Sequence, residues 1–224
     1  TGSTTALKLD VTGSATSSFG GGINLNAGCF AVSNVCVGSG GGSMCAAVYL
    51  QARGKRVLIL EKTELVGGTT ARSGGVMWIP NNPFMRRDGV ADSYEQAATY
   101  LDSVLGEQVD APGATRARRH AYLTEAPRMV DFLLSQGIKL TRVSSWPDYY
   151  DDRPGGSVPG RTVVAELFDA NELGPWKTKL RPGFLTVPAM LEEALELPKF
   201  RTSWKARGLM LRVAGRAVVA KLTG

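Results

Sequence analysis

The sequence predicts an α/β fold that contains a βαβ unit, and three consecutive patterns carry this prediction. Residues 35–37 are a short apolar run, typical of a buried strand, and a glycine-rich turn follows them. Residues 44–53 combine helix-forming residues with an apolar face, and Gly54 predicts the end of that helix. Residues 56–61 form a second apolar run that ends in an acid, which is typical of a fully buried parallel strand.

The turn between the first strand and the helix has the composition of a phosphate-binding loop. It matches the pattern G-x-G-x-x-G except at the sixth position, where the small residue Ser43 stands. The first glycine permits a tight turn, the second lets the backbone approach a pyrophosphate, and the amides at the helix start then face the anion. The candidate phosphate-binding residues are Gly38, Ser39, Gly40, Gly41 and Gly42.

Glu61 and its neighbour Lys62 are the candidate ribose-binding residues. Glu61 ends the second strand, where a carboxylate accepts hydrogen bonds from ribose hydroxyls and disfavours the 2′-phosphate of NADP. The combination predicts a Rossmann-like dinucleotide-binding fold. The alternative is a glycine-rich turn in a fold that binds no nucleotide.

Two further glycine tracts favour FAD over NAD as the dinucleotide. Gly67-Gly68-Thr69-Thr70 follows shortly after the ribose-binding acid, and Ser73-Gly74-Gly75 follows that. Each tract brings more backbone against a ligand, and an NAD site has no need of them.

The order V-G-S-G-G-G, L-E-K, G-G-T-T-A-x-S-G-G and then residues 78–82 resembles the FAD-binding domain of 3-ketosteroid Δ1-dehydrogenases. These enzymes belong to the succinate dehydrogenase and fumarate reductase flavoprotein superfamily. The resemblance implies that the second and third tracts run under the FAD diphosphate and beside the isoalloxazine ring. Covalent members carry a flavin-linking histidine after the tract, and none stands here, so the resemblance implies non-covalent FAD.

Residues 146–150, W-P-D-Y-Y, and the glycines up to Gly160-Arg161 resemble the segment that brings an aromatic residue into the substrate pocket of steroid dehydrogenases. The resemblance implies that Tyr149 contacts the substrate, with Tyr150 as a close competitor. The alternative is that these aromatic side chains cover an apolar surface at a turn.

The activity implied by the resemblance is removal of two hydrogens from neighbouring carbons of a 3-ketosteroid, by a deprotonated tyrosine and flavin N5. In the family, the principal tyrosine base and the segment that closes over the flavin lie in the C-terminal part. We therefore expect an incomplete FAD-binding fold that requires a C-terminal remainder. The alternatives are a fumarate reductase-like enzyme, which the single histidine disfavours, and a truncated nucleotide-binding fragment without activity.

The pattern along the chain predicts three parts. Residues 1–30 are a flexible Gly/Ser/Thr-rich leader, residues 31–145 the N-terminal part of the FAD-binding domain, and residues 146–224 the beginning of a substrate-binding or cap region. Within them we expect helices over 93–105, 114–136 and 188–197, the second interrupted at Pro127, and a strand over 162–167.

The composition limits the classes of binding partner that we expect for the chain. The net charge of +6 permits attraction to phosphates and to an anionic membrane surface, so peripheral membrane association is compatible with it. No aromatic-interleaved basic stripe accompanies the arginines, so nucleic-acid binding is not expected. Three cysteines without C-x-x-C spacing disfavour a zinc site and a disulfide framework and favour a reducing, cytoplasmic setting.

The remaining polar and thiol residues are interpreted as structural. His120, the single histidine, is expected on a solvated surface, which leaves no metal site or His-based catalytic group. Cys36 and Cys45 are expected to fill the core, and Asp151 and Asp152 to be solvated.

Overall fold

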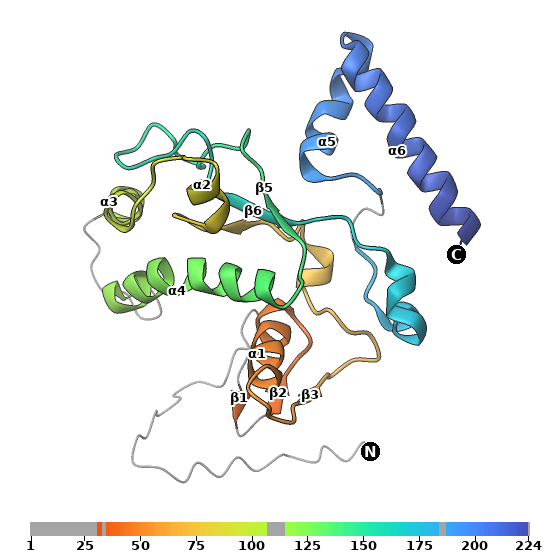
Figure 1. Cartoon of the computed structure of the whole chain (residues 1–224), viewed down its shortest axis with the longest axis horizontal. Coiled ribbons are helices and arrows are strands. Elements are labelled where there is room, and N and C mark those ends of the chain that lie inside the picture. Colours follow the sequence, from red (N-terminus) through yellow and green to blue (C-terminus); the bar gives the residue numbers. More distant parts are fainter. Residues whose placement is uncertain (1–30, 33–34, 107–114, 184–186, 224) are drawn as a thin grey trace, which may run out of the picture.

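The computed structural model describes residues 31–32, 35–106, 115–183 and 187–223 (Figure 1). The predicted leader, residues 1–30, lies outside the described residues.

The predicted βαβ unit is present. Strand β2 (Val35–Val37) leads into helix α1 (Gly41–Gln51), and β3 (Leu58–Leu60) returns parallel to β2 with Cys36 opposite Ile59. Strand β1 (Ala31–Val32), which the sequence pattern did not predict, pairs antiparallel with β2 and gives the order β1-β2-β3. Helix α1 packs against β2 and β3, so its first turn lies beside the ends of both parallel strands.

The expectation of a fully buried second strand is wrong for the described chain. Leu58 is 55% exposed and Leu60 40% exposed, because β3 is the edge strand of the described sheet and no described element covers their face. Parallel strands of doubly wound folds normally have helices over both faces. Here α1 covers only one.

A second sheet organises the centre of the chain. Its strands pair antiparallel in the order β4-β6-β5, with β4 at Met77–Trp78, β5 at Leu140–Arg142 and β6 at Thr162–Ala165. The strand expected over 162–167 is therefore confirmed, although it ends at Ala165. Strands on both sides of the expected boundary at 145/146 form this one sheet.

Three helices pack around the second sheet: α2 (Pro83–Arg87), α3 (Tyr94–Leu105) and α4 (Arg116–Ser135). The main cluster of buried apolar side chains lies between α2, α4 and this sheet and comprises Ile79, Phe84, Ala126, Val130, Leu133, Leu140 and Val163. Helix α3 begins and ends as the sequence predicts, since Ser93 Oγ accepts from the Gln96 amide and Gly106 follows the last turn at φ 70°.

The expected interruption at Pro127 is wrong, because α4 runs through it. A proline inside a helix removes one backbone hydrogen bond. Pro127 is buried beside Ala126 and Val130, so the packing of this face offsets that loss. The helix ends at Ser135, and the expected glycine, Gly137, follows with φ 82° while the Ile138 amide donates to Leu133 O.

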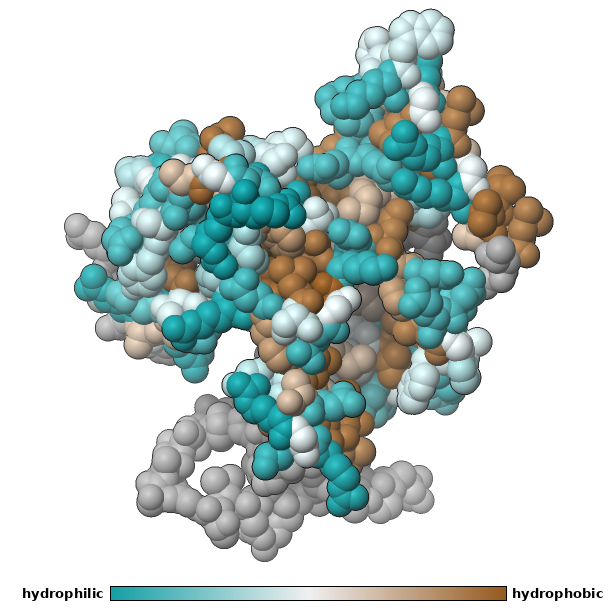
Figure 2. All heavy atoms as spheres, in the orientation of Figure 1, coloured by the Kyte–Doolittle hydropathy of each residue, from teal (hydrophilic) through white to brown (hydrophobic). Residues whose placement is uncertain are grey.

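Helix η2 (Ala170–Lys179) is held to the rest of the chain, since Leu180 directly after it forms a parallel bridge with Val66. The C-terminal unit that follows projects to the upper right of Figure 1 and comprises α5 (Leu191–Glu196), η3 (Leu197–Arg201) and α6 (Trp204–Thr223). Helix α5 lies within the range expected for a helix, whereas α6 was not predicted, since two glycines and a Val-Val pair lower its helix propensity. Helix α6 also carries exposed apolar residues, which Figure 2 shows as brown surface along the helix.

Candidate functional site

The first glycine tract forms a helix N-terminus that can receive an anion. Gly38 turns the chain at φ 83°, and its amide donates to Leu60 O at 2.6 Å, which holds the tract to the end of β3. Gly40 is the N-cap of α1, in an extended conformation, has no side chain of its own to cap the helix, and no acid stands in the first turn. The positive end of the helix dipole is therefore not neutralised by the helix's own residues.

Glu61 lies directly against this tract. Its carboxylate accepts hydrogen bonds from the Ser39 amide at 2.9 Å, from Ser39 Oγ, and from the Thr63 amide at 3.1 Å. The Ser39 hydroxyl is the main cause that lowers the pKa of Glu61 to about 2. Glu61 is therefore an ionised acceptor at neutral pH, as a ribose-binding carboxylate must be.

Folding stability should depend on Glu61 in the acidic range. Because the folded-state pKa is depressed from 4.5, this stabilisation is fully present above about pH 4.5 and is lost as the pH falls towards 2. We expect the stability difference between the wild type and Glu61→Gln, measured by urea unfolding at several pH values, to be largest above pH ~5 and to shrink below that. A difference that stays constant down to pH ~2.5 would contradict the assigned hydrogen bonds.

The second glycine tract closes over the first. The Gly67 amide donates to Ser39 Oγ at 2.8 Å, so one hydroxyl joins the second tract to Glu61. A side chain at Gly68, which has φ 52°, would place its Cβ 3.3 Å from Gly40 Cα. The two tracts therefore meet backbone to backbone, and both this contact and the positive φ favour glycine at position 68.

The Thr70 hydroxyl accepts a hydrogen bond from an amide that a phosphate would use. Its Oγ1 accepts from the Gly41 amide at 2.9 Å, at the start of α1. A diphosphate oxygen that takes this amide must displace the Thr70 hydroxyl, which is exposed. Thr70 thus stands where the second tract would contact a diphosphate.

The third tract leads away from this corner towards β4. The short helix η1 (Thr70–Arg72) connects it to the second tract, and Ser73 Oγ then accepts from the Gly75 amide at 3.1 Å. Thr69, Ser73, Gly74 and Gly75 are exposed, as is Lys62. The structure thus joins the first tract, Glu61 and the second tract in one place, with the third tract extending from them.

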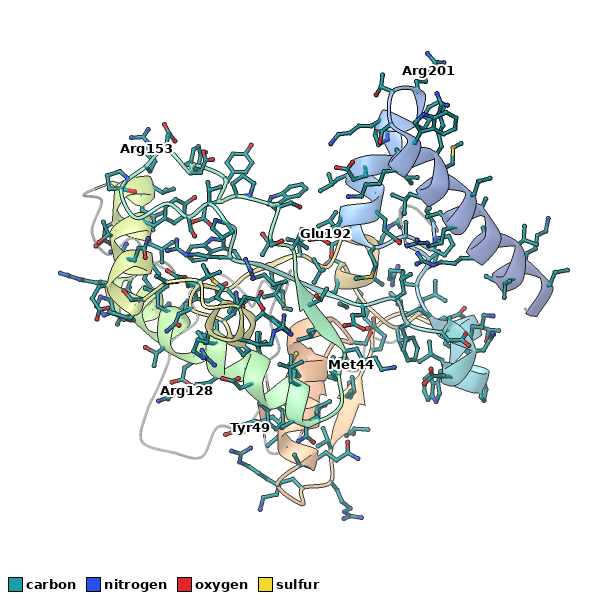
Figure 3. The ribbon with its side chains drawn as sticks, turned by 45° about the horizontal axis from the view of Figure 1, so that its top comes forward. Met44, Tyr49, Arg128, Arg153, Glu192 and Arg201 are labelled. Carbon is teal, nitrogen blue, oxygen red and sulfur yellow. The ribbon has the colours of Figure 1, made fainter. Side chains whose placement is uncertain are left out.

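The structure does not bring Tyr149 to the glycine tracts. Tyr149 is 85% exposed, and its ring meets that of Tyr150, 45% exposed, edge to face at 4.9 Å between centroids. Both lie in the loop of residues 146–160, beside α3. Figure 3 shows Arg153 of this loop well apart from Met44 in the first turn of α1.

A buried cluster of charges under this loop was missed by sequence reasoning. Arg161 is fully buried and pairs with Asp92 and Asp148, and the Trp78 indole donates to Asp148 at 2.7 Å. Asp148 and Arg161 belong to the W-P-D-Y-Y and Gly-Arg patterns described above, and Asp92 directly precedes the helix expected over 93–105. Nothing in the spacing indicated that they pair.

The residues interpreted as structural mostly lie as expected. His120, Asp151 and Asp152 are exposed, and Cys45 is partly buried against the main core cluster. The Cys36 side chain lies outside the described residues. Among the residues the structure describes, no three His, Cys, Asp or Glu side chains form a group that could hold a metal ion, and no helix is long and apolar enough to span a membrane.

Comparison with known proteins accounts for this arrangement. Residues 34–223 match the FAD binding domain family, a range that includes all three glycine tracts and Glu61. The chain belongs to this family. The predicted cofactor, FAD, and the coarse fold class, a Rossmann-like FAD-binding fold, agree with this membership.

Similarity to individual members of the FAD-binding family is also clear. The chain is 37% identical to a 3-oxosteroid 1-dehydrogenase of Mycolicibacterium smegmatis over 85% of this chain and 33% of that protein. It is 35% identical to a 4-oxocyclohexanecarboxylate 2-dehydrogenase of Sinomonas cyclohexanicum, over 84% of this chain and 33% of that protein. A crystal structure of 3-ketosteroid delta1-dehydrogenase from Sterolibacterium denitrificans in complex with 1,4-androstadiene-3,17-dione matches with a TM-score of 0.66 and 36% identity, over 80% of this chain and 31% of that one. The chain therefore spans about a third of the length of these relatives.

The residues present fit an FAD molecule at this corner. Gly68 lies tightly against Gly40, where an added Cβ would come within 3.3 Å of its Cα, and an ionised carboxylate lies directly after β3. Gly38 to Gly42 and Thr70 would hold the diphosphate, and Glu61 the ribose.

Proposed function

We propose that this chain is the cofactor-holding part of an FAD-dependent dehydrogenase that removes two hydrogens from neighbouring carbons of a 3-ketosteroid. The observation that carries the proposal is the joined Glu61 and glycine tracts, in a chain 37% identical to a 3-oxosteroid 1-dehydrogenase. FAD bound at the tracts would supply the hydride acceptor. The binding is non-covalent, because the single histidine, His120, lies on α4 and not at the tracts.

The names of two relatives support a ring ketone as the substrate class. One acts on a 3-oxosteroid at position 1, and the other on a 4-oxocyclohexanecarboxylate at position 2. In both, the numbered carbon lies two ring atoms from the ketone carbon. Loss of a hydride from that carbon is favoured when the proton on the carbon between them is removed, because the ketone oxygen then takes up the negative charge.

This chain's own part in the reaction is to bind and orient. Thr69, Ser73, Gly74 and Gly75 would lie beside the flavin ring, and Tyr149 would contact the substrate. A phenol that removes the proton needs a pKa well below its ordinary value near 10. Burial raises the pKa of Tyr122, whose hydroxyl donates to Trp78 O, so Tyr122 stays protonated and is not a candidate base.

The proposal includes a C-terminal remainder that completes the fold and supplies the principal base. Two exposed apolar surfaces support it. One is the open face of β3 at Leu58 and Leu60. The other is a stripe on α6, most exposed at Trp204 (83%), Leu211 (73%) and Leu222 (80%). Large apolar patches on monomers mark contact surfaces, and a further segment of an FAD-binding fold would cover both.

The test is complementation. The chain is purified alone and together with the segment that follows the matched third of the Mycolicibacterium smegmatis relative, and dye-coupled oxidation of androst-4-ene-3,17-dione is measured. We expect no turnover by either piece alone and turnover by the mixture. Turnover by this chain alone would overturn the need for a remainder. A mixture that acts on dicarboxylates but not on the steroid would overturn the substrate class.

A further inference from the structure

The most buried charges of the described chain lie beneath the loop that carries Tyr149 and Tyr150. Arg161 Nε and Nη2 donate to the two carboxylate oxygens of Asp92 at 2.9 and 2.7 Å, and Nη1 donates to Asp148 at 2.7 Å. The side chains of Arg161 and Asp148 are fully buried, and that of Asp92 is 1% exposed. One guanidinium thus holds two carboxylates from distant parts of the sequence.

Further donors complete the coordination of both carboxylates. Asp148 also accepts from the Trp78 indole at 2.7 Å and from the Ser157 amide at 3.1 Å. Asp92 also accepts from the Asn81 amide at 2.7 Å. The cluster has one positive and two negative charges, and these N–H groups stabilise the excess negative charge.

The cluster joins the cofactor side of the chain to the loop. Trp78 belongs to β4, which begins two residues after Gly75 of the third glycine tract. Asp148 directly precedes Tyr149. The guanidinium of Arg161 also lies 5.6 Å from the Trp78 ring centre and 5.7 Å from that of Tyr100, within cation–π range.

The loop has little freedom to move. A side chain at Gly160 would collide with Trp146 O, 1.4 Å from the added Cβ, so the two ends of the loop touch. A side chain at Gly155 would collide with Gln96 O of α3 at 2.4 Å. The Tyr150 amide donates to the hydroxyl of Tyr100, also on α3, at 3.1 Å.

The two tyrosine rings nevertheless point outward from this fixed base. Their exposure, 85% for Tyr149 and 45% for Tyr150, leaves apolar ring surface in water on a loop whose backbone is held by buried charges. Binding residues are commonly placed on loops that a rigid scaffold positions. A fixed loop with an exposed aromatic pair has the form of a recognition surface.

We infer that Arg161, with Asp92 and Asp148, is a positioning residue, which sets the Tyr149–Tyr150 pair at a fixed distance from the strand that leaves the third glycine tract. The inference rests on the proposed function, since it takes these tyrosines to meet the substrate. It requires an arginine: a lysine keeps the charge but has no planar fork to engage both carboxylates at once.

The first test uses this chain and needs no substrate. Arg161→Lys is compared with Arg216→Lys, which makes the same change in the Arg216–Glu193 pair of the C-terminal unit. We expect amide hydrogen exchange in residues 146–157 to become about tenfold faster or more in Arg161→Lys, with the α4 core unchanged, and no change in the loop of Arg216→Lys. Unchanged exchange in the loop, or equal acceleration in loop and core, would overturn the inference.

The second test uses the complemented enzyme and a double-mutant cycle. If Arg161 acts by positioning Tyr149, then Tyr149→Phe lowers kcat/KM in the wild-type background. In the Arg161→Lys background the same substitution has little further effect on kcat/KM. If the two substitutions lower kcat/KM additively, Arg161 contributes only to stability and the inference is overturned. Absence of steroid turnover by the wild-type mixture would count against the proposed function instead, and the exchange result would still decide the role of the cluster.

Discussion

Replacing Arg161 with leucine should lower the free energy of unfolding by about 3–5 kcal/mol. The substitution leaves Asp92 and Asp148 buried without their cation, and leucine fills the space of the guanidinium only in part. Breaking a buried ion pair on one side is far more costly than losing a surface pair, because the remaining charges cannot return to water without local unfolding. Urea unfolding followed by circular dichroism gives the value.

Arg86→Leu is the matched control. Arg86 pairs with Asp131 at 2.8 Å, but both side chains are about half exposed, at 45% and 51%. We expect this substitution to cost no more than about 1 kcal/mol. A loss below about 1 kcal/mol for Arg161→Leu as well would mean that the Asp92–Arg161–Asp148 cluster is not formed as described.

Glu61→Ala should weaken FAD binding by about 1.5–3 kcal/mol, roughly 10- to 150-fold in Kd. The ionised carboxylate is the predicted acceptor for the ribose hydroxyls, and it also holds Ser39 at the centre of the joined tracts. Titration of flavin fluorescence, with the C-terminal segment present so that the fold is complete, measures the loss.

The control for this change is Glu64→Ala, three residues further along and exposed. It should leave the FAD affinity within about twofold of the wild type, because it lies outside the ribose contact. FAD affinity that is also unchanged in Glu61→Ala would remove Glu61 from the site.

The cofactor corner could be predicted because its signals are local. A strand, a glycine tract, a helix and a second strand follow one another within residues 35–61, and each predicts its own conformation. The joining hydroxyl of Ser39 could not be predicted in the same way. Its role depends on Gly67, 28 positions further along the chain, and on where the second tract lies.

In the rest of the chain, several elements and contacts could not be predicted from sequence patterns. Strand β4 has only two residues, too short for a period, and it pairs with β6 across more than 80 positions. Arg161 meets Asp92 across 69 positions, and a single arginine after a glycine carries no indication of burial. For α6 a signal was present, since Ala206, Leu209 and Val213 share a buried face at helical spacing.

In the proposed complex FAD lies against the two joined glycine tracts, with its ribose at Glu61. Amide hydrogen exchange with and without saturating FAD tests it most directly, in the chain supplemented with its C-terminal segment. We expect FAD to slow exchange at residues 38–43 and 67–70 and to leave the Trp204–Thr223 helix unchanged, with no comparable protection from NADP. Flavin that binds without protecting either tract would contradict the account.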